Sequence, residues 1–184
     1  DSSARPALEA KAYYGSWFRG AVHIGKDQPL RVVWPYPQRR IHSGSEHVLF
    51  PESEDLLSNA PDGFLVQYTR LREPARRFEE QRLADAVAVA GLSAASRDRR
   101  RAVVLVAGPE PHDRSELTME GARHFLASIG VPFFTISVLP YADEVVAGFG
   151  GTALSGSSVA GLREAFRAVA DALERQRVVW VAGK

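Results

Sequence analysis

The residues whose types and spacing are most suited to chemistry lie in one stretch, AVVLVAGPEPHDRSE, at positions 102 to 116. Its apolar part, residues 102–107, is typical of a buried parallel strand that ends at Gly108 and opens into a polar loop. Three side chains of that loop can transfer protons, namely Glu110, His112 and Asp113. Loops at the carboxyl ends of strands bind ligands in α/β proteins, so the stretch predicts a binding site or an acid/base centre.

The second half of the chain supplies the elements that would position this loop. Apolar spacing predicts helices over 78–92, 117–129 and 158–176, and strands over 102–107, 131–139 and 178–182. Strands that are joined by crossover helices pair in parallel. We therefore predict an α/β fold with a doubly wound, mostly parallel sheet and helices on both faces.

The remaining segments carry weaker patterns. They favour helices over 6–24 and 53–60, short strands over 29–36, 47–50 and 64–71, and a turn over 148–156 before the last helix. The length of 184 residues, of which 45% are hydrophobic, is enough to bury one sizeable core. The sequence thus predicts a single domain over 1–184.

Composition weighs against several functional classes. The 23 Lys and Arg residues against 22 Asp and Glu give a formal charge of +1, so no overall basic field indicates nucleic acid or an anionic membrane. The absence of cysteine excludes disulfides, thiolate metal ligands and cysteine nucleophiles. No apolar run approaches the ~20 residues of a membrane span. The five histidines lack metal-type spacing, and the basic runs at 38–40, 75–77 and 96–101 are expected to be solvated turns.

Five segments follow one another between residues 78 and 181: LADAVAVAGL, RAVVLVAG, GARHFLASIG, VPFFTISVLP and VVAGFGG. In this order they resemble the second half of a von Willebrand factor type A (vWA) domain, of the bacterial vWA-related type. The opening DSSAR is similar to the family's first metal-binding loop, and LRVVWPY to its second strand. Because the family's first strand precedes that loop, we expect this strand upstream of Asp1 or elsewhere in the protein.

The resemblance implies a cation site that has lost ligands. Members of the family hold Mg²⁺ with an Asp-x-Ser-x-Ser loop, a Thr and an Asp, which are the hard oxygen ligands that Mg²⁺ prefers. Asp1 and Ser3 match two of these positions, whereas Arg5, Gln81 and Gly108 stand in place of the others. We therefore expect no metal or other cofactor, Mg²⁺ being possible only if Asp1 and Ser3 retain a weak site.

Two functions follow as expectations. The first is a non-enzymatic protein–protein interaction module, part of a larger bacterial secreted or cell-envelope protein, that inserts into no membrane and binds no nucleic acid. Its binding loops would contain Asp1, Ser3, Arg5, Gln81, Arg82, Gly108, Glu110 and Asp113. The alternative is an α/β enzyme that uses Glu110, His112 and Asp113, although no set of nucleophile, base and orienting group can be assembled from the sequence.

Overall fold

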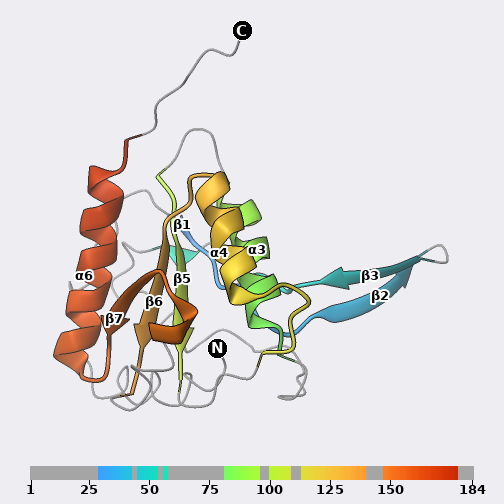
Figure 1. Cartoon of the computed structure of the whole chain (residues 1–184), viewed down its shortest axis with the longest axis horizontal. Coiled ribbons are helices and arrows are strands. Elements are labelled where there is room, and N and C mark those ends of the chain that lie inside the picture. The colour runs from blue at the N-terminus through green and yellow to red at the C-terminus, as the bar shows by residue number, and fades with distance from the viewer. Residues whose placement is uncertain are drawn as a thin grey trace, which may run out of the picture.

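The computed structural model describes residues 29–42, 45–53, 56–57, 81–95, 100–108, 113–139 and 147–177. Their arrangement is shown in Figure 1. The predicted helix over 6–24, the predicted strands over 64–71 and 178–182, and the basic run at 75–77 lie outside these residues. None of the helices in the described ranges is long and apolar enough to cross a membrane.

A parallel three-stranded sheet lies at the centre of the described structure. Its strands are β5 (Val103–Ala107), β6 (Phe133–Ser137) and β7 (Thr152–Ser155), in the order β5-β6-β7. The register pairs Leu105 with Thr135 and Ile136 with Leu154. The predicted strands over 102–107 and 131–139, and their parallel pairing, are confirmed.

Strand β7 corrects the prediction of a turn over 148–156. Two glycines with positive φ, Gly150 at 69° and Gly151 at 79°, lead directly into it. A Cβ atom on Gly151 would lie 2.8 Å from the carbonyl oxygen of Phe133, so only glycine lets the chain approach β6 this closely. Residues 147–149 are helical and the four residues after Gly151 pair with β6, so the predicted turn is reduced to Gly150 and Gly151.

Three helices flank the sheet and confirm the predicted helical segments. They are α3 (Leu83–Ala94), α4 (Met119–Ser128) and α6 (Val159–Arg175). Helices α4 and α6 begin at capping side chains, because Thr118 accepts a hydrogen bond from the Gly121 N–H and Ser158 from the Gly161 N–H. Gly130, at φ 66°, follows α4 and allows the chain to turn toward β6.

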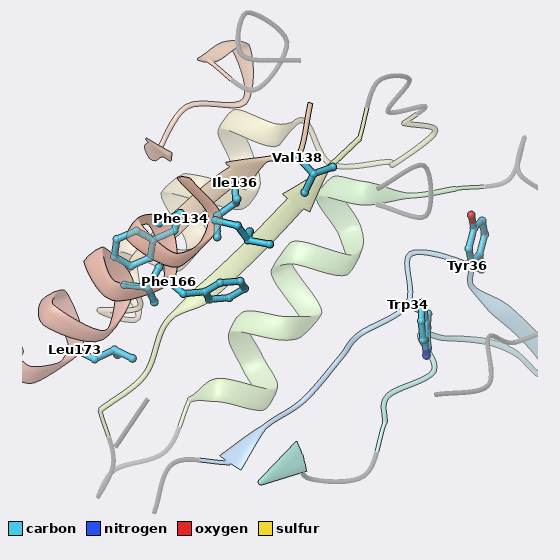
Figure 2. Close-up of a cluster of buried hydrophobic side chains, with 10 residues drawn as sticks. Trp34, Tyr36, Phe134, Ile136, Val138, Phe166 and Leu173 are labelled. Atoms are coloured by element: carbon cyan, nitrogen blue, oxygen red, sulfur yellow. The ribbon is translucent and has the colours of Figure 1, made fainter. Parts of the chain in front are cut away.

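The side chains of the strands separate into two hydrophobic clusters. Val103 and Leu105 of β5 pack with Leu83, Val87 and Leu126 from α3 and α4. Phe134 and Ile136 of β6 pack instead with residues of α6, including Phe166 and Leu173, as Figure 2 shows. Since successive strand residues point to opposite faces, α3 and α4 cover one face of the sheet and α6 the other. The structure is thus α/β, with a small parallel sheet between helices.

The N-terminal part of the described structure contains short antiparallel pairs. Strand β1 (Pro29–Leu30) pairs with β4 (Leu56–Leu57), and β2 (Gln38–His42) pairs with β3 (Ser45–Leu49) in a hairpin that projects from the helices and sheet (Figure 1). The hairpin agrees with the predicted strand over 47–50. It corrects the expected turn at 38–40, which is part of β2.

The predicted strand over 29–36 and the predicted helix over 53–60 are also corrected. Only Pro29–Leu30 belongs to a strand, and Val33 makes one isolated bridge to Glu52. The helix is wrong at Leu56–Leu57, which form β4. Ser53 does not cap a helix, because its hydroxyl accepts the Val32 N–H at 2.9 Å and its own N–H donates to the Val32 carbonyl at 2.8 Å. Pro35 and Pro37 limit pairing in this segment because proline lacks a backbone N–H.

Candidate functional site

Four of the predicted site residues lie in the described structure, and the loop connections bring three of them together. Gly108 directly follows β5 and is buried. Gln81 and Arg82 precede α3, and the Gln81 carbonyl accepts the Arg114 N–H at 2.9 Å beside Asp113. The residues at 81–82 and at 113–114 therefore meet at the amino end of α3. Asp1, Ser3, Arg5, Glu110 and His112 lie outside the described residues.

Asp113 holds the first turn of α3. Its carboxylate accepts the Leu83 N–H at 2.9 Å and the Ala84 N–H at 3.4 Å. It also accepts the N–H of Ser115 at 2.9 Å and the hydroxyl of Ser115 at 2.5 Å. The first N–H groups of a helix have no partner within the helix, so a carboxylate at this end stabilises it through hydrogen bonds and the helix dipole. Asp113 thus acts as a cap supplied from a distant part of the chain.

Between α3 and the 113–117 loop, each segment donates hydrogen bonds to side chains of the other. The Ser115 hydroxyl accepts the N–H of Asp85 at 3.0 Å. In return, the Asp85 carboxylate accepts the N–H of Leu117 at 3.0 Å and that of Glu116 at 3.2 Å. Two carboxylates, one from each segment, therefore bind backbone N–H groups of the other segment. This reciprocal capping fixes the backbone of both segments, and therefore the positions of the candidate binding residues that they carry.

Arg82 lies between two carboxylates on this scaffold. Its Nη1 is 3.2 Å from Oε1 of Glu116 and 3.6 Å from Oδ2 of Asp85. The side chains of Arg82 and Asp85 are only 19% and 13% exposed, whereas that of Glu116 is 84% exposed. The backbone N–H of Arg82 donates to the Pro35 carbonyl at 2.8 Å. Asp85 is therefore the sheltered partner of the guanidinium, and Glu116 is its partner on the solvent side.

Asp85 and Glu116 are two site residues that were not predicted from the sequence. One available signal was the position of Asp85 in the first turn of a predicted helix, where a carboxylate is favoured. A second was the surplus of capping residue types before α4, because Asp113 and Ser115 come too early to cap a helix whose cap is Thr118. No sequence rule pairs those residues with α3, because the two segments are 30 positions apart.

The described residues do not fit the Mg²⁺ site that the vWA resemblance implies. Gly108 has no side chain to offer, and Gln81 is fully buried. Asp113, the nearest described carboxylate after β5, directs its oxygens to the N–H groups of α3. In the part of the chain that the structure describes, no three His, Asp or Glu side chains are grouped so that they could hold a metal ion.

We predict that the protein gives no one-site response to Mg²⁺ or Mn²⁺ at concentrations on the order of millimolar, because the ligands that remain are too few to offset the dehydration of the ion. Isothermal calorimetry and a thermal-shift titration of the full chain measure this directly. A saturable response that Asp1→Ala abolishes would contradict the prediction, since Asp1 is the one carboxylate of the family pattern that the sequence retains.

By its fold the protein is an α/β protein with a parallel sheet. Its candidate site is Arg82, which forms ion pairs with Asp85 and Glu116 where the loop after β5 meets α3. Comparisons with protein-family models, with curated proteins and with solved structures find no match to this chain. The similarity to vWA domains accordingly stays a prediction that depends on the residues quoted above.

Proposed function

We propose that this chain is a non-enzymatic protein-interaction domain of the vWA type, which binds a carboxylate of a partner protein through Arg82. The observation that carries the proposal is the position of Arg82, which forms an ion pair with the sheltered Asp85 and a second one with the exposed Glu116 among the residues that the structure describes. In vWA domains a cation bridges the domain to a partner's carboxylate. Here the guanidinium would pair with that carboxylate directly.

The physical chemistry of arginine suits this role. The guanidinium is always charged and presents five N–H donors in a planar fork that matches a carboxylate. An exposed ion pair such as the one with Glu116 contributes only about 0–1 kcal/mol, so an incoming carboxylate can take the place of Glu116 at little cost. Asp85 would keep the guanidinium oriented during the exchange. Preorganisation of this kind reduces the entropy that is lost on binding.

The topology also supports a doubly wound vWA fold, which we propose as the finer architecture. Strands β5 and β6 are parallel neighbours joined through α4, and α6 follows β7 on the opposite face. Such a sheet gathers the loops at the carboxyl ends of its strands along one edge. The loop between β5 and α4, which carries Asp113 and Glu116, belongs to that edge.

The enzyme alternative has less support. It needs Glu110, His112 and Asp113 as proton-transfer groups. Asp113 instead uses both carboxylate oxygens to accept N–H groups at the start of α3. A general acid or base must reach the proton that it transfers, and these bonds hold the Asp113 carboxylate against the helix. A protein-binding role requires no such freedom of Asp113.

We predict that Arg82→Ala lowers partner affinity by about tenfold or more, because truncating one member of a hydrogen-bonded charge pair costs roughly 2–5 kcal/mol at an interface. Affinity capture with the full chain as bait, followed by titration of the partner that is recovered, measures the effect. Arg175→Ala is the matched control. Arg175 lies near the carboxyl end of α6, its side chain is highly exposed, and its ion pair with Asp171 spans 3.9 Å.

The two variants together distinguish binding at Arg82 from binding elsewhere. Loss of the partner by the Arg82 variant with retention by the Arg175 variant supports the proposal. If the Arg82 variant keeps full affinity, or if both variants lose it equally, the binding surface is not the surface around Arg82.

A further inference from the structure

Glu116 is held in place over Arg82 by its own backbone. Its N–H donates to Asp85, and the preceding Ser115 is bound through its hydroxyl to the Asp85 N–H. Arg114, two residues before Glu116, donates its N–H to the backbone carbonyl of Gln81, which precedes Arg82. The Glu116 carboxylate, although largely exposed, therefore stays near the guanidinium at a high effective concentration.

We infer that Glu116 is an internal competitor for the partner's carboxylate, so that the Arg82 site is self-inhibited and selects an acidic peptide segment. This inference rests on the proposed function. Glu116 mimics the ligand by making the contact that a partner's side chain would make, and it has to leave before that side chain binds. A single weak carboxylate gains little from the exchange, whereas a segment with several carboxylates offers repeated chances to replace Glu116.

The size of the inhibition follows from the strength of the exposed pair. When a binding-competent state is only partly populated, the apparent dissociation constant rises by the inverse of the competent fraction. An exposed pair of this kind shifts that population by a factor of up to about five. Removing the charge of Glu116 while keeping its length should therefore tighten binding by about two- to fivefold.

The test uses the full chain and a fluorescein-labelled hexaglutamate peptide as the probe, with fluorescence anisotropy at low ionic strength to limit screening. The variants are Glu116→Gln, Arg82→Ala, the double variant, and Glu120→Gln. Glu120 is an exposed residue in the first turn of α4, so its variant changes the net charge by the same amount as Glu116→Gln. Thermal unfolding of each variant checks that the fold is retained.

The expected result is tighter binding for Glu116→Gln, with little change for Glu120→Gln and no gain when Arg82 is also replaced. An equal gain for Glu120→Gln, or a gain that survives the loss of Arg82, would show a nonspecific charge effect and overturn the inference. If Arg82→Ala weakens binding but Glu116→Gln does not strengthen it, the inference fails and the proposed function stands. If the wild-type chain does not bind the probe, the inference fails, because it requires that the site accept an acidic segment. If the chain binds but Arg82→Ala leaves binding unchanged, the proposed function itself fails.

Discussion

Leu105→Ala is expected to lower the free energy of unfolding by about 2–5 kcal/mol, the largest change in stability that we predict for one side chain of this protein. Leu105 lies at the middle of β5 and is only 6% exposed. It belongs to the cluster that joins β5 to α3 and α4, so its truncation removes buried methyl groups and leaves a cavity between the sheet and two helices. Urea unfolding, followed by circular dichroism, gives the change in free energy.

The matched control is Leu92→Ala in α3. Leu92 is the same residue type but is 60% exposed, so its replacement should change stability by less than about 0.5 kcal/mol. A loss below about 1 kcal/mol for Leu105→Ala would contradict the prediction. It would mean that Leu105 is not packed against α3 and α4 as described.

Asp113→Ala is expected to destabilise the protein by about 1–2 kcal/mol, because it removes the carboxylate that accepts the N–H groups of Leu83 and Ala84. Asp113→Asn should cost less, since the amide oxygen can still accept one of these bonds. Urea unfolding measures the loss, and amide hydrogen exchange at residues 83 and 84 should accelerate more than exchange in the rest of α3.

Asp171→Ala serves as the control for the loss of one carboxylate. Asp171 is about half exposed on α6 and its only described ion pair, to Arg175, spans 3.9 Å, so little stability should depend on it. Equal destabilisation by the Asp113 and Asp171 variants would show that the contacts of Asp113 with α3 contribute no more than an exposed surface pair.

Sequence patterns predicted the elements that have long or strongly periodic apolar faces. Helix α6 alternates buried Leu162, Phe166 and Val169 with charged positions, and β5 consists almost entirely of branched apolar residues. Such patterns arise because one face of the element is buried, so they can be recognised in the sequence before the fold is known. Strands β2 and β7 were not predicted because they have no continuous apolar run: β2 carries polar and charged residues, and β7 carries mostly small ones. Their pairing is decided by neighbouring strands that the sequence pattern does not identify.

The candidate site was predictable only in position. That the loop after β5 and the start of α3 both carry polar residues suggested a shared edge, and the structure places Arg82 and Asp113 close together there. The role of Asp113 could not be predicted from the sequence, because a carboxylate in a loop is equally suited to bind a ligand or the amino end of a helix. Only the hydrogen bonds between segments that lie 30 positions apart distinguish the two roles.

The reciprocal capping between α3 and the 113–117 loop also bears on the order in which the chain folds. During synthesis from the amino end, the residues of α3 emerge well before Asp113 and Ser115, whose side chains accept the N–H groups of its first turn. A nascent chain that stops short of residue 113 therefore has the helix sequence without its cap. Because closing a loop of this length costs entropy before the contacts form, α3 should acquire full protection together with β5 and the start of α4, as one cooperative unit.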